Sequence, residues 1–423
     1  MTKSVVSVVK GTDAEKMVAE ALSLIGGVSS LIKPGSVVVI KPNSIGDRPP
    51  ERVTSTSPEM VGAVIKELRK AKPKEIILTE TVFPPETLQG FELNGHRKAA
   101  EDAGAKVINI TGYKDMLRIP LRDNLGDVDH IFLPRFLIEA DHFVNLPVYK
   151  SHISMMYTGA MKNLFGLLSR EDKDRMHLNF PKNGQAGCAL GALDLWFVTK
   201  AGLSIVDMIR VGEGYGPLAG IPTDFGCVVA GKDPIAVDAT CCRMTGIDIT
   251  KTPYFQAVLD CKLGQYKEED IEVRGRKPKD VFKKIWTPYL DGLDKYPEYK
   301  IYKHPGACFL CEGLIAFSLE RIKPLGEYEK NAGMSIVYGV AKDLPQGVKP
   351  EDLILLGNCI PEKFRDKGIW VQGCPPPEMQ PAYAIMDRKY EGWGTPVRSK
   401  RIHRQEYDDF QEHQKKLRAE AKL

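Results

Sequence analysis

The sequence predicts an α/β protein whose main sheet is largely parallel and carries helices on both faces. Apolar strand segments alternate with amphipathic helix segments over residues 5–275. Strands of a parallel sheet are buried on both faces, so they appear as continuous apolar runs such as VVVI at 37–40. A smaller α/β unit with four cysteines follows towards the C-terminus. Alternation of this kind is typical of a doubly covered sheet.

The individual elements follow from local patterns. Segments rich in Val and Ile predict strands at 5–11, 36–43, 75–81, 106–110, 141–149, 203–209 and 226–231. Apolar residues at helical spacing predict helices at 14–27, 57–71, 95–104 and 233–246. The second helix has Ser57 as an N-cap, Pro58 in its first turn and a basic end that suits the helix dipole.

The composition changes after the last of these elements and suggests four regions. Residues 1–285 form the α/β core domain, and 286–306 form a connector with many charges and prolines. Prolines at that spacing exclude a long helix or a central strand. Residues 307–393 form the unit with four cysteines, and 394–423 form a polar helical tail.

Charge and hydropathy narrow the functional class. Lys and Arg number 59 and Asp and Glu 55, which gives a formal net charge of +4. This near balance argues against a dedicated nucleic-acid-binding protein, which carries a strong basic excess. No apolar run reaches the roughly 18 residues that a membrane span needs, and the N-terminal segment does not resemble a signal peptide. We therefore expect a cytoplasmic protein with no nucleic-acid or membrane partner.

Polar side chains follow several predicted strands, where an open α/β sheet binds its ligands. Lys41 and Asn43 leave the strand 36–43, and Ser55 precedes a helix N-terminus. A lysine, a hydroxyl and free backbone N–H groups can together hold a phosphate or a carboxylate. The alternative for Ser55 is a capping role, which is the commonest task of such hydroxyls.

The segment 145–177 offers a second set of polar groups. Lys150 and His152 follow a strand, and Lys162 and Asn163 follow a stretch rich in Gly and Met. The lysines and Asn163 predict anion binding, and His152 predicts a general acid or base, with Lys150 as a further catalytic candidate. A single histidine is more often structural, so that alternative stays open for His152 and for His177.

A glycine-rich run at 212–220 gives a third set. Glu213 is a candidate for proton transfer, and Gly214 would let the backbone approach a ligand closely. The alternative is a surface turn with a solvated glutamate. The run lacks G-x-G-x-x-G before a helix, and no phosphate-binding G-x-x-x-x-G-K-[ST] loop occurs in the chain. A standard dinucleotide site is therefore excluded.

These motifs, in their order, resemble a known family. The motifs are KPN, TSTSPE, NLPVYKSH, GAMKNLFGL, IVDMIRVGEGYGPLAG and AGKDPIAVDA. Their series resembles the domain of unknown function 362 family over roughly residues 5–275. The resemblance implies little about the reaction, but many members are described as iron–sulfur centre proteins with a ferredoxin-like module. This chain lacks the C-x₂-C-x₂-C-x₃-C-P run of such a module, so any cluster depends on its own cysteines.

Four cysteines in the last third suggest a metal centre. Cys308 and Cys311 form a C-x-x-C pair, and Cys359 and Cys374 lie in GNCIP and GCPPP. In a reducing compartment such a set favours metal binding over disulfides. Four thiolates suit a four-iron (4Fe-4S) cluster or a tetrahedral zinc ion. The proline after Cys374 and the wide spacing of the second pair favour the cluster; zinc and unliganded cysteines remain as alternatives.

Together these features predict an iron–sulfur protein, with an oxidoreductase or an oxidoreductase component as the favoured function. Its expected partners are an anionic small-molecule substrate at the strand ends and a redox partner protein. One alternative is a non-redox lyase, isomerase or hydrolase with a structural zinc or cluster. Another is an electron-transfer subunit with no catalytic activity.

Overall fold

The structure is a computed structural model of the chain. It describes residues 2–45, 49–82, 88–121, 128–178, 187–260, 262–390, 392 and 404–421. None of the helices in these ranges is long and apolar enough to cross a membrane.

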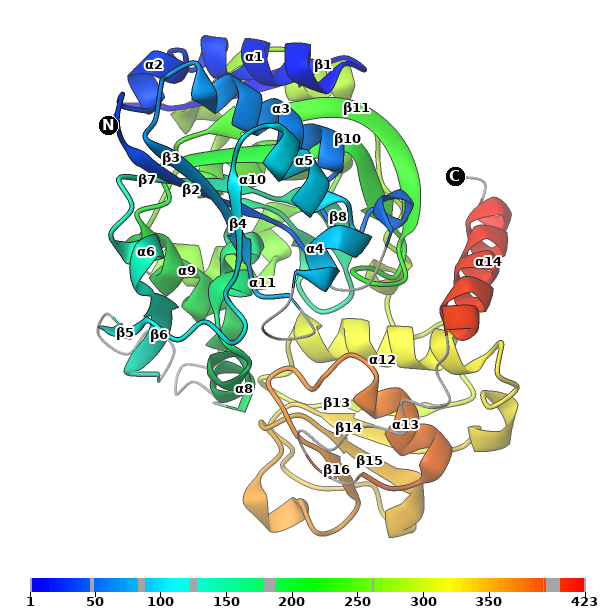
Figure 1. The fold of residues 1–423 in the computed structure, drawn as a ribbon. Helices are drawn as coiled ribbons and strands as arrows, with labels where there is room; N and C mark the ends of the chain where they lie inside the picture. The colour runs from blue at the N-terminus through cyan, green and yellow to red at the C-terminus, as the bar shows by residue number, and fades with distance from the viewer. Residues whose placement is uncertain are drawn as a thin grey trace.

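A large, mostly parallel sheet forms the first unit (Figure 1). Its strand order is β12-β1-β11-β10-β7-β2-β3-β4, and β8 and β9 continue it beside β10. Strand β11 runs antiparallel to β1 and β10, and β9 runs antiparallel to β8; the other pairs are parallel. The strands are β1 (Ser4–Lys10), β2 (Val37–Pro42), β3 (Glu75–Glu80), β4 (Lys106–Asn109), β7 (His142–Leu146), β8 (Val148–His152), β9 (Met156–Thr158), β10 (Leu203–Glu213), β11 (Ile221–Gly231) and β12 (Ile271–Gly275). The predicted fold class is confirmed.

Helices cover both faces of this sheet because successive side chains of a strand point to opposite faces. Val38 and Ile40 of β2 pack in one core, beneath α1 and α3, whereas Val39 packs in the other, with α7, α9 and α10. The helices of this unit are α1 (Ala14–Leu24), α2 (Val28–Leu31), α3 (Pro58–Arg69), α4 (Gln89–Leu93), α5 (His96–Asp102), α6 (Arg135–Ile138), α7 (Ala160–Leu164), α8 (Arg170–Leu178), α9 (Gly187–Thr199), α10 (Pro234–Thr245) and α11 (Pro253–Asp260). A small antiparallel pair, β5 (Met116–Pro120) and β6 (His130–Pro134), lies beside them.

The second unit is a separate four-stranded parallel sheet. Its order is β13 (Lys300–Lys303), β14 (Ser335–Tyr338), β15 (Leu353–Leu356) and β16 (Ile369–Val371), with α12 (Phe309–Ile322) and α13 (Gln380–Asp387) packed against it. Edge strand β13 lies inside the predicted connector 286–306, so this unit begins at residue 300 and not at 307. The connector's prolines are compatible with an edge strand, which has one unpaired side.

The two units share apolar packing. Ile153, Tyr215 and Ala219 of the first unit belong to the same buried cluster as Leu314 and Phe317 of α12. The units are therefore not independent bodies joined by a connector, because separating them would expose this cluster to water.

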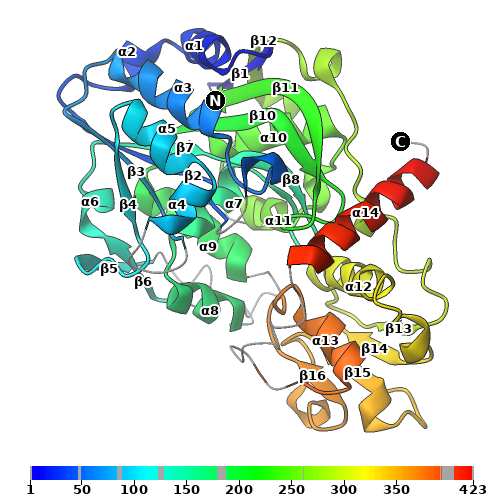
Figure 2. The same cartoon turned by 45° about the vertical axis from the view of Figure 1, so that its right-hand side comes forward.

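The C-terminal helix α14 (Arg404–Glu420) is docked onto both units (Figure 2). Phe410 is fully buried and lies over the guanidinium of Arg321 in α12. On the other side, Gln414 accepts a hydrogen bond from the backbone N–H of Tyr215 at 2.8 Å. The predicted polar tail is thus a helix held at defined contacts, which a sequence with few apolar residues does not reveal.

Candidate functional site

Basic side chains at the carboxyl ends of β2 and β8 lie close to basic side chains of α7 and α8. The carboxyl end of β3, which carries Glu80, lies beside them. Four lysines lie there: Lys41, Lys150, Lys162 and Lys173. The positive charges of Lys41 and Lys162 lower the pKa of both Lys150 and Lys173. In the text below, the cleft is the name of this group of four lysines and the side chains that contact them. It lies at the strand ends, as expected for an open α/β sheet.

Lys41 is fully buried, and its ammonium has three acceptors. It forms an ion pair with Glu80 at the end of β3, and it donates to Asn163 Oδ1 at 3.0 Å and to the carbonyl of Pro42 at 2.9 Å. Burial lowers the pKa of Lys41, and the neighbouring Glu80 carboxylate opposes that shift. With all three N–H groups used, Lys41 stabilises the cleft wall, and the prediction that it binds a substrate anion is not supported.

The predicted polar residues beside Lys41 also have structural partners. Asn163 donates to Asn145 Oδ1 at 2.8 Å and to the carbonyl of Lys41 at 3.2 Å. Ser55 Oγ accepts a hydrogen bond from the N–H of Ile45 at 2.9 Å, so it holds a turn. Asn163 and Ser55 thus have structural partners, and their role in anion binding stays a prediction.

Lys150 has a different environment from Lys41. It is 1% exposed and donates to Asn43 Oδ1 at 2.7 Å and to the carbonyl of Thr54. Asn43 thus fixes the position of the Lys150 side chain. Burial lowers the pKa of Lys150 well below its ordinary value, and the positive charges of Lys162 and Lys41 lower it further. Among the described residues, the hydrogen-bond acceptors of Lys150 are two uncharged oxygens, whereas Lys41 has a carboxylate among its acceptors.

His152, at the end of β8, is held in one tautomer. Its Nδ1 accepts hydrogen bonds from the backbone N–H groups of Ser154 at 3.3 Å and Met155 at 3.2 Å. An Nδ1 that accepts has no proton, so the neutral ring carries its proton on Nε2. Burial lowers the pKa of His152 well below its ordinary value, and the nearby charges of Lys162 and Lys150 add to the effect. His152 is a neutral hydrogen-bond donor.

Helix α8 adds two residues on one face. Lys173 donates to Thr81 Oγ1 at 2.8 Å, and burial lowers its pKa to about 8. His177, four residues later, donates from Nδ1 to the carbonyl of Pro375 at 3.3 Å, and burial lowers its pKa to about 4. Lys173 and Glu80 are not among the site residues predicted from the sequence. The i, i+4 spacing of Lys173 and His177 was the available signal.

Glu213 and Gly214 serve a different purpose from the predicted one. The Glu213 carboxylate accepts from the N–H of Trp286 at 2.8 Å and pairs with Arg418 of α14 at 2.8 Å. Gly214 has φ of +82°, and a Cβ there would lie 2.5 Å from Oε1 of Gln414. Both residues hold α14 in place, so the predictions of proton transfer by Glu213 and of ligand contact by Gly214 are not supported.

Two buried aspartates are helix caps. Asp207 Oδ2 accepts from the N–H and the hydroxyl of Ser57, at the start of α3. Asp238 accepts from the N–H groups of Ala160 and Met161 at 2.6 and 3.0 Å, which fixes the start of α7. Asp238 thereby orients the short helix that presents Lys162 to the cleft.

The four late cysteines lie at the carboxyl edge of the second sheet. Cys308 is the N-cap residue of α12 and Cys311 is in its first turn, while Cys359 and Cys374 follow β15 and β16. Strands of a parallel sheet end at one edge, so the loops after them converge there. Cys308 is exposed, Cys311 is buried, and the other two are half-buried.

Two of the sulfurs, those of Cys311 and Cys359, lie beside a glycine. Gly357 has φ of +94°, and a Cβ built there would lie 3.4 Å from Sγ of both Cys311 and Cys359. Burial raises the pKa of the Cys311 thiol well above its ordinary value, and the nearby Cys308, Cys359 and Cys374 raise it further. Among the described residues, no three His, Cys, Asp or Glu side chains lie where they could hold a metal ion together. The four thiols are neighbours, but their sulfurs are not arranged as ligands of one metal ion.

The cysteine loops are joined to the cleft through α8. The N–H of Cys374 donates to the carbonyl of His177 at 2.7 Å. Asn358 donates to the carbonyl of Leu178 at 2.6 Å and accepts from the N–H of Gly373 at 2.7 Å. Helix α12 also approaches the backbone just after His152 closely, because a Cβ at Gly313 would overlap the carbonyl oxygen of Ile153. The cysteines and the cleft are therefore adjacent.

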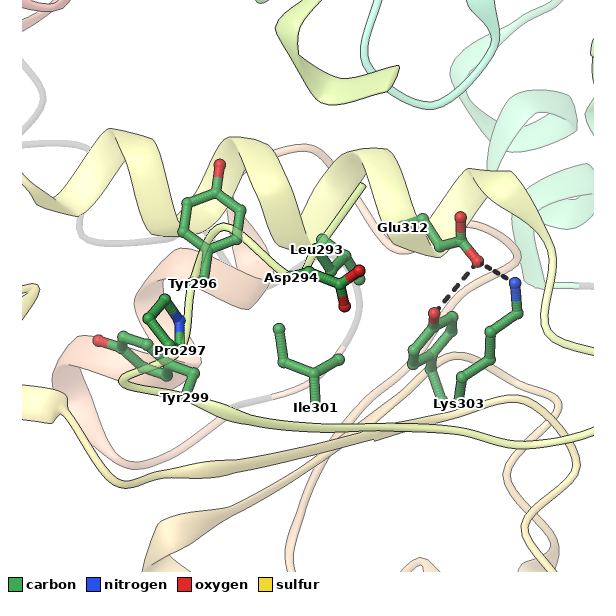
Figure 3. Close-up of a pocket in the computed structure, with 9 residues that line it drawn as sticks. Leu293, Asp294, Tyr296, Pro297, Tyr299, Ile301, Lys303 and Glu312 are labelled. Atoms are coloured by element: carbon green, nitrogen blue, oxygen red, sulfur yellow. Dashed lines mark hydrogen bonds and ion pairs between the residues drawn. The ribbon is translucent and has the colours of Figure 1, made fainter. Parts of the chain in front are cut away.

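A surface cavity of about 430 Å³ opens between α12 and β13 (Figure 3). Its polar end is formed by Glu312, which pairs with Lys303 at 2.6 Å and accepts from the Tyr338 hydroxyl at 3.1 Å. Glu312 comes one residue after Cys311. The other lining residues are Leu293, Asp294, Tyr296, Pro297, Tyr299 and Ile301.

Comparisons with known proteins give a family for the first unit. Residues 38–243 match the family described as Domain of unknown function (DUF362). A thylakoid-associated protein of Synechocystis sp. is 30% identical over 129 residues, which are 30% of this chain and 40% of that protein. The chain thus spans less than half the length of this relative.

Two solved structures are similar at low identity. The lactate racemase apoprotein of Thermoanaerobacterium thermosaccharolyticum has a TM-score of 0.40 and 13% identity, over 91% of this chain and 86% of that one. A protein of Thermotoga maritima has a TM-score of 0.36 and 16% identity, over 53% and 57%. The resemblance predicted from the ordered motifs is confirmed over residues 38–243, which form a DUF362 segment.

Proposed function

We propose that the protein is an iron–sulfur protein that acts on an anionic small molecule, as an oxidoreductase or a component of one. Cys308, Cys311, Cys359 and Cys374 would hold a 4Fe-4S cluster, and the adjacent cleft would hold the substrate. The observation that supports this proposal is that Cys308, Cys359 and Cys374 lie near enough to Cys311 to raise its pKa, in loops of which one bonds to His177 beside the basic cleft.

The donor set fits a cluster. All four donors are thiols, the ligands that iron–sulfur clusters use, and Gly357 leaves room where any other residue would place a Cβ against two sulfurs. When bound, the cluster would supply one-electron transfer. The exposed position of Cys308 gives a redox partner protein a point of approach at the surface. A tetrahedral zinc ion remains the alternative occupant of the same thiols.

The cleft residues suit an anion that carries a reacting carbonyl or hydroxyl group. Lys162 and Lys173 supply positive charge, and a carboxylate or phosphate would relieve their mutual repulsion. The Nε2–H of His152 would donate a hydrogen bond to the reacting oxygen, because this ring stays neutral. Neutral histidines also favour the second candidate, a non-redox lyase or isomerase in which the metal centre is structural.

The test is the visible spectrum of anaerobically purified protein, together with iron, sulfide and zinc analysis. We expect broad absorbance that bleaches on reduction, and about four iron and four sulfide per chain. Cys311→Ser should lose this absorbance, while Cys227→Ser, a change at a buried cysteine of β11, should keep it. One zinc per chain without iron would refute the cluster and favour the non-redox candidate.

The anion cleft has a separate test. Lys162→Met should weaken sulfate binding by roughly tenfold, about the loss of one charge-assisted hydrogen bond. Thermal stability should be unchanged or slightly higher, because one repulsive charge is removed. Lys303→Met, at the surface cavity, is the control that should bind sulfate normally. Equal binding by the Lys162 variant and wild type would exclude Lys162 from the site.

A further inference from the structure

Two buried lysines of the cleft differ in how many hydrogen bonds they donate. An ammonium has three N–H donors, whereas a neutral amine has two N–H groups and a lone pair. Lys41 has three acceptors, one of them the Glu80 carboxylate. Among the residues that the structure describes, Lys150 has two acceptors, Asn43 Oδ1 and the carbonyl of Thr54, and both are uncharged.

The surroundings of Lys150 also oppose a positive charge on it. Lys41 of β2 and Lys162 of α7 face it with positive charge, and neutral His152 follows it on β8. Glu80, one of the two carboxylates that act on it, is paired with Lys41. The other, Glu378 of the cysteine unit, raises the pKa of Lys150, but by less than Lys162 or Lys41 lowers it. Burying an ammonium without a paired carboxylate is costly, so such a lysine releases its proton.

We propose that Lys150 is a neutral amine in the folded protein and is the proton acceptor of the cleft. Its two N–H groups are fixed by Asn43 and Thr54, and its lone pair accepts a proton from the bound substrate. This inference rests on the proposed anion cleft and adds the role of one residue and the kind of substrate. The substrate is a carboxylate- or phosphate-bearing anion with an acidic proton at its reacting atom.

The hydrogen bonds favour proton transfer over covalent catalysis. Condensation of Lys150 with a carbonyl group would release water and form an imine, which has one N–H group when protonated and none when neutral. At least one of the two buried acceptors, Asn43 Oδ1 and the carbonyl of Thr54, would therefore lose its donor, at a cost. Proton transfer keeps both hydrogen bonds: the bond from hydrogen to the substrate breaks, its electron pair stays on the substrate, and Lys150 becomes an ammonium. That ammonium stabilises the substrate anion beside it.

The charge state can be read without a substrate. Protein labelled with [15N]lysine at Nζ is titrated by NMR, and the signal of Lys150 is assigned by its loss in Lys150→Arg. We expect the shift of a neutral amine at neutral pH, and an ammonium shift for Lys41 under the same conditions. An ammonium shift for Lys150 at neutral and mildly alkaline pH would overturn the inference.

Calorimetry with sulfate tests the proton-accepting role. Bound sulfate should drive uptake of about one proton by Lys150, seen as a dependence of the heat on the ionisation enthalpy of the buffer. Lys150→Arg should bind sulfate without that uptake, and Lys162→Met should bind more weakly but retain it. Uptake that persists in Lys150→Arg would overturn the role and assign the proton to His152 or His177. Absence of sulfate binding by wild type would count against the anion cleft, while the NMR result would still decide the state of Lys150.

Discussion

Replacement of Lys41 by methionine should strongly destabilise the protein, although a methionine fills a similar volume. The side chains of Lys41 and Glu80 are 0% and 2% exposed, so the variant would leave a carboxylate buried without its cation. Removing one member of a buried ion pair costs about 3–5 kcal/mol. We therefore expect Lys41→Met to lower the free energy of unfolding by roughly that amount.

A double-variant cycle separates this cause from loss of packing. Lys41→Met combined with Glu80→Gln leaves no buried charge, so most of the lost stability should return, with a coupling energy of about 2–3 kcal/mol. The measurement is urea denaturation at one pH for wild type, both single variants and the double variant. Single variants within about 1 kcal/mol of wild type would refute the reasoning, since that is the value of an exposed pair.

Three further predictions concern Lys150, Asp238 and Gly357. Because the folded-state pKa of Lys150 is lowered, the unfolded chain binds a proton that the folded one lacks, between that pKa and the ordinary value of about 10.4. As pH rises through that window, the free energy of unfolding of wild type should increase by about 1.4 kcal/mol per pH unit relative to that of Lys150→Met. Urea titrations at several pH values measure this difference, and a difference that does not change with pH would contradict the lowered pKa. Asp238→Ala should lower the free energy of unfolding by about 2–4 kcal/mol, because two N–H groups of α7 lose their acceptor. Asp238→Asn should lower it by about half as much. Equal effects of the two variants in the same assay would exclude the capping role. Gly357→Ala should lower iron content after anaerobic reconstitution, since its Cβ would crowd two sulfurs; Gly347→Ala, a positive-φ glycine with open space around it, is the control. Equal iron in both variants would show that the space at Gly357 is not needed.

Much of the fold can be read from the sequence because the signals are local. Apolar runs predict the strands, and α3 and α10 begin after Ser57 and Asp233, where the sequence predicts helices from residues 57 and 233. The rule that parallel strands end at one edge also predicts that Lys150 and His152 lie near Lys162. The edge strand β13 was missed because four residues with prolines on both sides carry little periodic signal.

The use of each polar group was decided by tertiary structure. Lys41 and Lys150 both leave apolar strands with the same local pattern, yet Lys41 pairs with Glu80, 39 residues away, and Lys150 donates to the uncharged oxygens of Asn43 and Thr54. The glycine-rich run around Glu213 predicts a residue of the cleft, but the Glu213 carboxylate forms an ion pair with Arg418 of the last helix.

The sequence by itself therefore determined the α/β class, the family match over residues 38–243 and the edge of the sheet where polar groups collect, because these depend on short-range periodicity and ordered motifs. Tertiary structure alone decided which lysine is paired, which histidine nitrogen carries the proton and which loops meet the cysteines. Those properties depend on partners far apart in the chain, such as His177 and Pro375, 198 residues apart. The charge and hydrogen-bonding state of a side chain is set by the groups that surround it in the folded molecule, and no local pattern contains them.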